Sequence, residues 1–365
     1  MITPTTVVAL SAEALDIPLR TPFGIATGTQ DVAHNILVTV KLADGTRGYG
    51  EAAPFAVVNG ETQESAMLAL LAIRSGIEGA DVREWRRIAA WLEEHIAKAA
   101  SARCAVETAL LDALTRQAGM PLWAFFGGAS TQLETDMTIT TGTVDQATSA
   151  AQDILARGIR MIKLKVGSGD TALDLARITA VHAVAPAAPL ILDGNGGFTA
   201  DSALHLLALL QSQGIRPVLF EQPVPQQDWD GLYQVTHWGG IPVAADESVQ
   251  NVTDALRVAQ TQAAQVVNIK LMKCGIVAAL DIAALCRSMQ IGLMIGGMVE
   301  SILAMTTSAC FAAGQGGFTY IDLDTPLFLA ENPFVGGFAQ SGATLDLAQI
   351  SAGHGVTPRV LDFQV

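Results

Sequence analysis

Basic residues are scarce in this 365-residue chain: lysine and arginine number 21, against 35 aspartates and glutamates. The formal net charge is -14 at pH 7. Binding to nucleic acid or to an anionic membrane depends on clustered lysine and arginine, so this charge balance argues against both partners. We therefore expect a small molecule as the partner, and the sequence leaves self-association into a homo-oligomer open.

Cysteine is scarce as well, and no two cysteines have the spacing of a metal site. The four are scattered along the chain without a CxxC pair: Cys104, Cys274, Cys286 and Cys310. This pattern favours neither a zinc site nor a disulfide framework. Reduced thiols, buried as small apolar groups, lead us to expect a cytoplasmic protein.

Signals for export and for a membrane span are also missing. The first twenty residues contain no basic stretch followed by a continuous apolar run, so no secretory signal is expected. Residues 301–321 carry no charge, but Ser, Thr, Gln and a glycine-rich "GQGG" interrupt them. That stretch is a poor membrane span and is expected to lie in a core.

Two patterns of apolar residues divide the chain into two parts. Residues 1–127 mix alternating strand-like runs, with a turn at Asp44 and Gly45, and helical stretches such as "SARCAVETALLDALTRQAG". This mixture predicts an α+β domain. From about residue 130, short apolar runs alternate with helix-length segments rich in Ala and Leu, which is typical of parallel βα units. Single cores stop growing near ~250 to 300 residues, so two domains are expected.

A charged residue closes each of seven apolar runs in the second part of the chain. These residues lie 22 to 30 positions apart: Lys165, Asp193, Glu221, Asp246, Lys270, Glu300 and Asp322. One strand and helix unit of a barrel needs roughly 25 to 30 residues, and active sites of (β/α)8 barrels lie at the carboxyl ends of the strands. With "DMTIT" at 136–140 as the first strand, the spacing predicts a barrel whose charged strand ends form a site. Simple exposure of strand ends is the alternative.

Two lysines are placed to act as bases. In "RMIKLKVG", Lys163 and Lys165 are two residues apart, so both point into the barrel. Their repulsion is expected to lower the pKa of each below the usual ~10.4. Lys270 lies four strands further round, so a substrate carbon between Lys165 and Lys270 would meet a base on each face. Alternatively, Lys270 could form a Schiff base, as lysines in barrel aldolases do.

Three carboxylates end the consecutive runs between these lysines: Asp193, Glu221 and Asp246. Burying three anions together costs several kcal/mol each unless a cation compensates. Histidine and cysteine are absent from the strand ends, and an oxygen-only ligand set favours Mg²⁺ or Mn²⁺ over Zn²⁺. Such an ion, chelating a substrate carboxylate, would stabilise the enolate formed when the neighbouring carbon loses its proton.

The motifs together resemble a known family. "KLK", "DGNGG", "FEQP", "ADES" and "NIKLMKCGI", with "GYGEAAP" in the first domain, are similar to motifs of the enolase superfamily, in its muconate lactonizing enzyme subgroup. The resemblance covers essentially the whole chain. It implies an α/β fold with a modified TIM barrel, (β/α)7β, at residues 128–324. An α+β capping domain of residues 1–127, completed by residues 325–365, would cover the barrel.

The resemblance also assigns roles by position. It implies Lys165 and Lys270 as the acid/base pair with Lys163 as their helper. It implies one Mg²⁺ held by Asp193, Glu221 and Asp246, with Asn195 beside the metal site.

The last barrel strand indicates the substrate. In "YIDLDTP", Asp322 and Asp324 are two residues apart and share a face, and paired carboxylates suit a substrate ammonium group. This DxD resembles the dipeptide epimerases, which implies 1,1-proton transfer at the α-carbon of the C-terminal residue of a dipeptide. The alternative is that either aspartate caps a turn before Pro326.

The capping loop argues against an acidic dipeptide. Epimerases of Ala-Glu are expected to carry a basic residue there, and "TPFGIATGTQ" at 21–30 has none. Glu300 could meet a cationic side chain or pair with a lysine, and Thr138 on the first strand is a further expected substrate contact. Five residues could line an apolar pocket or belong to the core: Phe23, Ile25, Phe55, Val57 and Met298.

Other activities remain as alternatives. N-acylamino acid racemase, o-succinylbenzoate synthase and muconate cycloisomerase act on substrates without a free ammonium group, which would gain nothing from Asp322 and Asp324. A non-catalytic binding protein on a retained barrel is a third class. The expected protein is an Mg²⁺-dependent dipeptide epimerase, an isomerase whose substrate is not Ala-Glu.

Overall fold

The computed structural model of the chain describes residues 2–25 and 28–359. Within them, eight parallel strands form one sheet in the order β12-β11-β10-β9-β8-β7-β6-β5. The two edges of the sheet meet, because the amide of Asp136 beside β5 donates to the carbonyl of Ile321 in β12 at 2.9 Å. The sheet is therefore curled into a barrel. Its strands are β5 Met137–Ile139, β6 Ile162–Lys165, β7 Leu190–Asp193, β8 Leu219–Glu221, β9 Val243–Ala245, β10 Val266–Ile269, β11 Gly292–Ile295 and β12 Phe318–Ile321.

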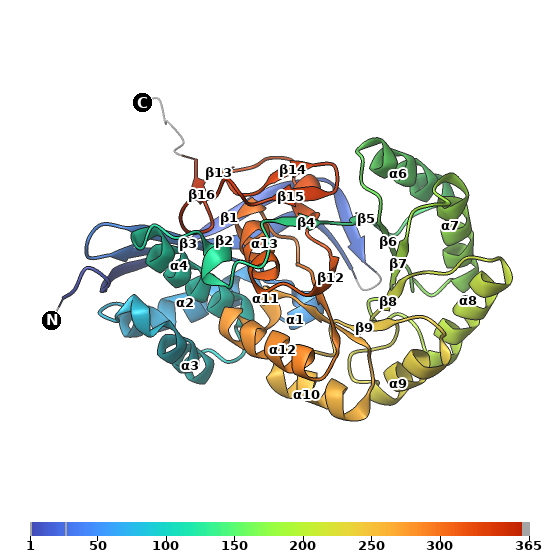
Figure 1. The fold of residues 1–365 in the computed structure, drawn as a ribbon, viewed down its shortest axis with the longest axis horizontal. Coiled ribbons are helices and arrows are strands. Elements are labelled where there is room, and N and C mark those ends of the chain that lie inside the picture. The colour runs from blue at the N-terminus through green and yellow to red at the C-terminus, as the bar shows by residue number, and fades with distance from the viewer. Residues whose placement is uncertain (1, 26–27, 360–365) are drawn as a thin grey trace.

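Helices follow every barrel strand but the last in the described part of the chain. They are α6 Val144–Ala156, α7 Thr171–Val184, α8 Ala200–Ser212, α9 Trp229–Trp238, α10 Val252–Thr261, α11 Leu271–Cys274 with α12 Ile276–Ser288, and α13 Ile302–Gln315. Figure 1 shows α6 to α9, green to yellow, following one another around the outside of the strands. After β12 only the 3-10 turn η2 Thr325–Leu327 follows directly. The predicted (β/α)7β barrel is confirmed.

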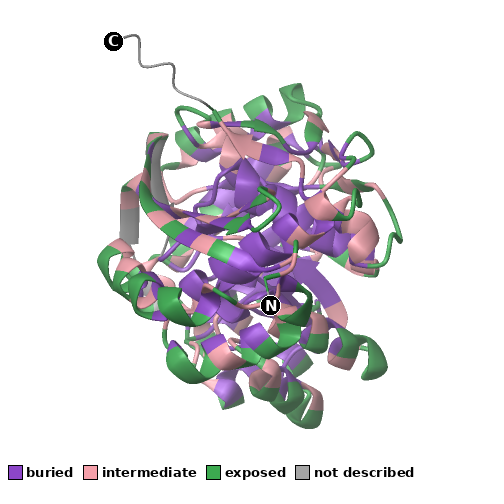
Figure 2. Ribbon diagram, turned by 90° about the vertical axis from the view of Figure 1, so that its left-hand side faces the viewer, coloured by how far each residue is buried: buried purple, intermediate pink, exposed green. Residues whose placement is uncertain are grey.

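Local sequence explains these elements. The strands β6, β7 and β8 are buried along their whole length, as expected of apolar parallel strands covered on both faces. Thr143 and Thr199 precede α6 and α8 as N-caps, and each accepts a hydrogen bond from the amide three residues later. Buried residues gather in the interior strands, while the outer helix faces are exposed (Figure 2).

Strand alternation separates the barrel interior into an apolar layer and a charged layer. The apolar layer is a cluster of Ile191, Leu219, Ala244, Val266 and Met294. Two residues further along their strands, on the same side, the chain carries Asp193, Glu221 and Asp246. The intervening positions, such as Leu192 and Phe220, belong to the core between strands and helices. The charged layer therefore lies next to this apolar layer, at the carboxyl ends of the strands.

The first part of the chain forms an antiparallel sheet with helices. Its elements are β1 Val7–Ile25, β2 Gly28–Leu42, β3 Arg47–Ala52, α1 Ala56–Asn59, α2 Gln63–Ile77, η1 Val82–Glu84, α3 Trp85–His95, α4 Ala100–Gln117 and α5 Leu122–Phe125. Most of α4 is buried. It lies so close to β3 that a Cβ atom on Gly48 or Gly50 would overlap the carbonyl oxygens of Ala109 and Ala105. This close approach explains the glycines of "GYGEAAP".

The C-terminal segment returns to both parts of the molecule. Its strands are β13 Phe334–Gly336, β14 Ala339–Ser341, β15 Thr344–Asp346 and β16 Val356–Pro358, and β15 pairs with β4 Gln132–Glu134. The amide of Arg20 donates to the carbonyl of Phe328, and the amide of Ala330 to that of Pro18. Figure 1 shows this segment, in red, beside β4 and the first sheet. These contacts support the proposed completion of a capping domain by residues 325–365.

Two further expectations from the sequence are that residues 301–321 lie in a core rather than in a membrane, and that the cysteines are buried, reduced thiols. Among the described residues, no helix combines the length and the apolar character needed to cross a membrane. The segment 301–321 contributes the buried helix α13 instead. All four cysteines are buried and form no disulfide, as predicted.

Candidate active site

A cavity lies where the charged strand ends converge. Its volume is about 30 Å³, whereas ligand pockets usually measure about 300 to 1,000 Å³. A ligand larger than a few atoms therefore requires the lining side chains to move apart. The lining residues are Phe55, Val58, Thr138, Lys163, Lys165, Asn195, Lys270, Gly297, Met298, Val299, Asp322, Asp324 and Thr325.

Lys163 is the centre of the charged layer. Its Nζ lies 2.6 Å from Asp322 Oδ2, 2.8 Å from Glu221 Oε2 and 2.9 Å from Asp193 Oδ2. Burial alone would lower the pKa of Lys163, but Asp193, Asp322 and Glu221 outweigh burial and raise it well above the usual value. The expectation that repulsion between the paired lysines lowers this pKa is therefore wrong for Lys163. The nearby carboxylates dominate because three of them contact one ammonium group.

Lys165 and Lys270 approach the cavity from opposite sides of the barrel. Lys165 ends β6, and Lys270 follows β10, four strands further round. The Nζ of Lys165 lies 2.6 Å from Asp193 Oδ2, and the Nζ of Lys270 lies 2.7 Å from Asp246 Oδ2. Burial acts to lower the pKa of Lys270, but Asp246 and Glu221 raise it above its usual value. The structure thus brings together the two lysines that the sequence placed on opposed strands.

The three carboxylates predicted as metal ligands are fully buried at the ends of adjacent strands, but their oxygens do not all lie within 4.8 Å of one another. Asp193, Glu221 and Asp246 have 0% exposure and come from the neighbouring strands β7, β8 and β9 or the residue after them. Glu221 Oε2 and Asp246 Oδ2 accept no hydrogen bond, although a lysine ammonium group lies near each. An all-oxygen set with unfilled acceptor capacity fits a hard divalent cation. Lysine ammonium groups supply the compensating charge in this arrangement.

Neighbouring polar residues hold these carboxylates in place. Lys273 donates to the backbone carbonyl of Asp246 at 2.6 Å and to its Oδ1 at 2.7 Å. Asn268 donates from Nδ2 to Glu221 Oε1 at 2.8 Å. The amide of Asn195 donates to Asp193 Oδ1 at 3.1 Å, and Asn195 has a positive φ of 41°. Asparagine is one of the residues that adopt a positive φ most readily. Asn195 also lines the cavity.

A second group of carboxylates lies where β5 meets β12. Carboxylate oxygens of Asp136, Asp322 and Asp324 all lie within 4.8 Å of one another. Asp324 Oδ2 accepts from the amide of Thr138 at 2.7 Å. Although Asp324 precedes η2, its side chain makes no capping bond, so the turn-cap alternative is not observed for it. Asp322 instead pairs with Lys163.

Asp136 is the unpartnered member of this group. Its side chain is fully buried, and neither Oδ1 nor Oδ2 has a hydrogen-bond partner. Burial, together with Asp322 and Asp324, raises the pKa of Asp136 well above its usual range. Burial and Asp322 also raise the pKa of Asp324 to about 7. This corner of the site is rich in carboxylates and suits a positively charged ligand group.

Glu300 departs from its predicted position. The strand β11 ends at Ile295, so Glu300 lies in the following loop rather than at the strand end. Its Oε1 accepts from the amide of Met298 at 2.7 Å, and Glu300 is absent from the cavity lining. Burial raises its pKa to about 8. The carboxylate points back onto its own loop because the buried amide of Met298 needs a hydrogen-bond acceptor there.

The apolar wall of the cavity was only partly anticipated. Phe55 and Met298 line the cavity as expected, and Val58 and Val299 join them. Side chains at three other expected positions lie outside the described part of the chain: Phe23, Ile25 and Val57. The side chains of 21–29 in the capping loop are likewise not described.

Sequence reasoning missed two charged contributors. Asp136 opens the "DMTIT" run, and Lys273 stands in "NIKLMKCGI". Both are fully or almost fully buried. A charge within an otherwise apolar segment was a usable signal in each case, since such residues are rarely buried without a partner or a role.

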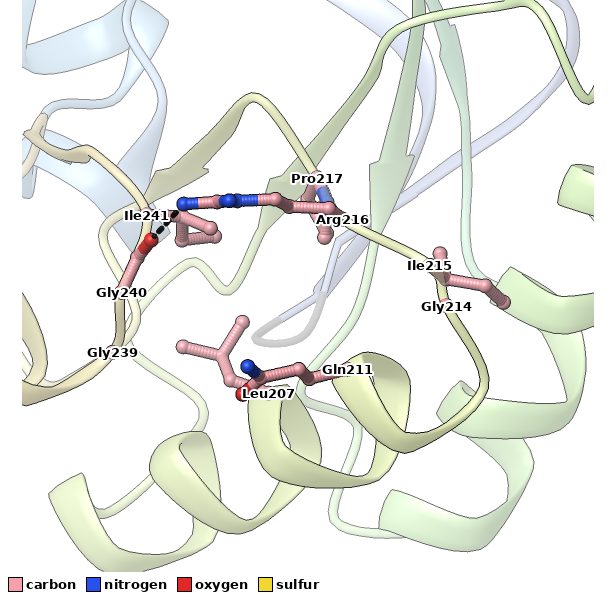
Figure 3. A pocket seen from close by; sticks show the side chains of 9 residues that line it. All are labelled: Leu207, Gln211, Gly214, Ile215, Arg216, Pro217, Gly239, Gly240 and Ile241. Atoms are coloured by element: carbon pink, nitrogen blue, oxygen red, sulfur yellow. Dashed lines mark hydrogen bonds between the residues drawn. The ribbon is translucent and has the colours of Figure 1, made fainter.

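Another hollow lies at the opposite end of the strands. It measures about 300 Å³ and lies before β8 and β9, where Arg216 donates to the carbonyl of Gly240 at 3.0 Å (Figure 3). The amino ends of barrel strands contribute mainly to stability. This hollow is therefore separate from the charged site.

Two family patterns match the chain over most of its length. Residues 146–362 match "Enolase C-terminal domain-like", and residues 8–127 match "Mandelate racemase / muconate lactonizing enzyme, N-terminal domain". The chain belongs to the enolase superfamily. The resemblance drawn from the sequence motifs is confirmed.

Individual relatives of this enolase superfamily member are similar over nearly their whole length. A protein of Herpetosiphon aurantiacus named "Aromatic dipeptide epimerase" is 56% identical over 97% of this chain and 99% of the relative. A crystal structure of a mandelate racemase/muconate lactonizing enzyme from Roseiflexus sp. is 61% identical, with a TM-score of 0.94 over 99% of this chain and all of the other. A dipeptide epimerase from Enterococcus faecalis V583, solved with Mg and the dipeptide L-Leu-L-Tyr, is 31% identical, with a TM-score of 0.93 over 96% of this chain and 99% of that one.

Proposed function

We propose that this enzyme is an Mg²⁺-dependent dipeptide epimerase that inverts the α-carbon of the C-terminal residue. One observation carries the proposal: Asp322 and Asp324 line the same cavity as the opposed lysines Lys165 and Lys270. The lysines provide the proton chemistry, and the aspartates select a substrate with a free ammonium group. The names of the relatives support this combination.

Lys165 and Lys270 act on opposite faces of the reacting carbon. The carboxylates that raise the pKa of Lys270, Asp246 and Glu221, are proposed ligands of the cation, and a cation bound to them would favour the neutral lysine. The neutral lysine on one face removes the α-proton, and the protonated lysine on the other face returns a proton, which inverts the configuration. For the opposite stereoisomer the two roles exchange. Positioned general acid and base groups typically contribute ~10² to 10⁴-fold each to such a rate.

The buried carboxylates Asp193, Glu221 and Asp246 would hold the Mg²⁺. Bound there, Mg²⁺ would supply positive charge beside the substrate carboxylate, which lowers the cost of the negative charge that develops as the α-proton leaves. Lys273, Asn268 and Asn195 orient these ligands through the hydrogen bonds described above. Lys163 compensates the remaining negative charge between the ligands and Asp322.

Asp322 and Asp324 would receive the ammonium group of the N-terminal residue. A buried ammonium group needs paired acceptors, and these two carboxylates line the cavity together with Thr138. Substrates of N-acylamino acid racemase and o-succinylbenzoate synthase have no free ammonium group, and would leave these carboxylates unpaired. The site therefore favours the dipeptide.

The apolar wall favours an apolar C-terminal residue. Phe55, Val58, Met298 and Val299 line the cavity, and no basic side chain other than the lysines of the site lines the described part of it. A glutamate side chain would lack a cationic partner there. We therefore expect aromatic and other apolar dipeptides to be better substrates than Ala-Glu, in keeping with the relative named for aromatic dipeptides.

Incubation of L,L-dipeptide libraries with the enzyme in D₂O tests the proposal. We expect one deuterium at the α-carbon, detected by mass spectrometry, with higher kcat/KM for Ala-Phe than for Ala-Glu. Chelation with EDTA should remove activity, and Mg²⁺ should restore it. Full activity after exhaustive chelation, or trapping of substrate on Lys270 by borohydride, would favour a Schiff-base enzyme instead.

A further inference from the structure

The loop that forms the apolar wall is held by two buried residues of the first sheet. Asn35 on β2 and Glu51 on β3 are each 1% exposed. Asn35 donates from Nδ2 to Glu51 Oε1 at 2.7 Å and to the carbonyl of Val299 at 2.9 Å. Glu51 Oε1 accepts from the amide of Ser301 at 2.9 Å, and its Oε2 accepts from the Ser301 hydroxyl.

These bonds leave the loop little independent freedom. Glu51 Oε2 also accepts from the amide of Ala304, so its carboxylate lies at the N-terminus of α13. The helix dipole favours a negative charge there, but burial is the larger effect and raises the pKa of Glu51. On the far side, Thr325 Oγ1 donates to the carbonyl of Glu300 at 2.9 Å. Met298 and Val299, which line the cavity, stand directly before these fixed positions.

We propose that Asn35 and Glu51 are positioning residues that set the Met298 and Val299 wall and thereby the discrimination between substrate side chains. This inference rests on the proposed dipeptide epimerase function. The pair belongs to the "GYGEAAP" strand and its neighbour, and neither Asn35 nor Glu51 lines the cavity. Their effect reaches the substrate through the loop, so it should alter side-chain preference more than proton transfer.

Glu107 offers a matched control. It is a buried glutamate from α4, and its Oε2 accepts from the amide of Val277 at the start of α12, at 2.9 Å. It therefore joins the same first part of the chain to another barrel helix. It does not line the cavity. Four hydrogen-bond donors face the two carboxylate oxygens of Glu51, so Glu51→Gln removes acceptor capacity that these donors use. Glu107→Gln makes the same chemical change with a smaller loss of acceptor capacity.

The experiment compares Glu51→Gln and Asn35→Ala with Glu107→Gln. For each variant, kcat and KM are measured with L-Ala-L-Phe and L-Ala-L-Ala. We expect Glu51→Gln to change the ratio of the two kcat/KM values by about ten-fold or more, chiefly through KM for L-Ala-L-Phe, since one methylene more or less in an apolar pocket is worth about 10- to 200-fold in discrimination. Glu107→Gln should leave the ratio within about two-fold.

Amide hydrogen exchange at Ser301 and Ala304 provides a second readout. It should accelerate in Glu51→Gln and remain slow in Glu107→Gln. An unchanged ratio despite accelerated exchange, or an equal change of the ratio in Glu107→Gln, overturns the inference. Asn35→Ala removes only the bonds to Val299 and Glu51. If Glu51→Gln fails to fold, the ratio of the two kcat/KM values in Asn35→Ala tests the inference instead.

Failure of the proposed function can be distinguished from failure of the positioning role. If the wild-type enzyme exchanges the α-proton of no dipeptide, the proposed function fails. The positioning role is then judged by amide exchange alone. Lost protection in Glu51→Gln with retained protection in Glu107→Gln supports it, and equal protection in both overturns it.

Discussion

The ammonium nitrogen of Lys163 lies 2.6 Å from Asp322 Oδ2, although the two residues are 159 positions apart in sequence. The same nitrogen contacts Asp193 and Glu221. One lysine thus joins the proposed metal ligands to the proposed ammonium-binding aspartates. Its charge influences both halves of the site.

Removing that charge should strengthen metal binding while it weakens catalysis. In Lys163→Met, Asp193 and Glu221 lose a competing cation, so Mg²⁺ should bind more tightly in isothermal titration calorimetry. Epimerisation should fall because Asp322 and the ligands lose their common counter-charge. Lys98→Met, at an exposed position, serves as the control and should change neither quantity. Weaker Mg²⁺ binding in Lys163→Met would contradict the competition.

The opposed bases predict reciprocal exchange defects. Lys165→Ala and Lys270→Ala should each abolish epimerisation, because a full cycle needs a proton donor on the face opposite the abstraction. Each variant should still exchange the α-proton of the one stereoisomer whose proton faces the remaining lysine. Loss of a general base costs ~10² to 10⁴-fold, so deuterium incorporation separates the two cases clearly. Loss of exchange for the same stereoisomer in both variants would disprove the two-base mechanism.

The three clustered aspartates should differ in importance. Burial, Asp322 and Asp324 raise the pKa of Asp136 well above the usual range, which favours its neutral form, and Asp136→Asn keeps a neutral side chain of the same shape. It should alter kcat/KM only a few-fold. Asp322→Asn should lower kcat/KM by about 10- to 100-fold, since hydrogen bonds to charged groups contribute about 1.5 to 3 kcal/mol.

Steady-state kinetics on one dipeptide distinguishes these variants. A loss in Asp136→Asn as large as in Asp322→Asn would show that Asp136 is ionised and contributes charge to the ammonium site. Asp324→Asn, which retains an acceptor for the amide of Thr138, should resemble Asp322→Asn.

Glu107 should make the stability of the protein depend on pH. Burial raises its pKa from 4.5 to about 7 in the folded state. Between these values the folded state holds a proton that the unfolded state has released, so the free energy of unfolding falls as pH rises. Below about pH 4.5 both states are protonated, and above about pH 7 both are ionised, so the contribution is constant at each end.

Urea unfolding of the wild type and Glu107→Gln at pH 5, 6, 7 and 8 isolates this group. The stability difference, wild type minus variant, should decrease from pH 5 to pH 7 and then level off. A difference that stays constant across this range would mean that Glu107 keeps an ordinary pKa in the folded protein.

Spacing and alternation along the chain determined the barrel and most of its charged layer. A strand and its helix occupy a nearly fixed number of residues, so charges 22 to 30 positions apart were bound to fall once per unit. Side chains two apart on a strand share a face, which placed Lys163 with Lys165 on β6. Asp322 and Asp324 follow Ile321, the last residue of β12, so the loop after the strand brings both to the cavity. Spacing and alternation are local geometric rules, and they need no knowledge of the neighbouring strands.

Contacts between distant segments were decided only by the tertiary structure. Closure of β5 against β12 brings Asp136 to Asp322 and Asp324, and no spacing along the chain indicates that meeting. Burial acts to lower the pKa of Lys163, but the pKa rises because Asp193, Asp322 and Glu221, brought from distant parts of the chain, outweigh burial. Glu300 turns to the amide of Met298, and Glu51 reaches α13, because buried loops and helix ends take the acceptor that lies nearest in space. Sequence patterns define which face a residue occupies, whereas its partners and its charge state depend on what the fold places opposite it.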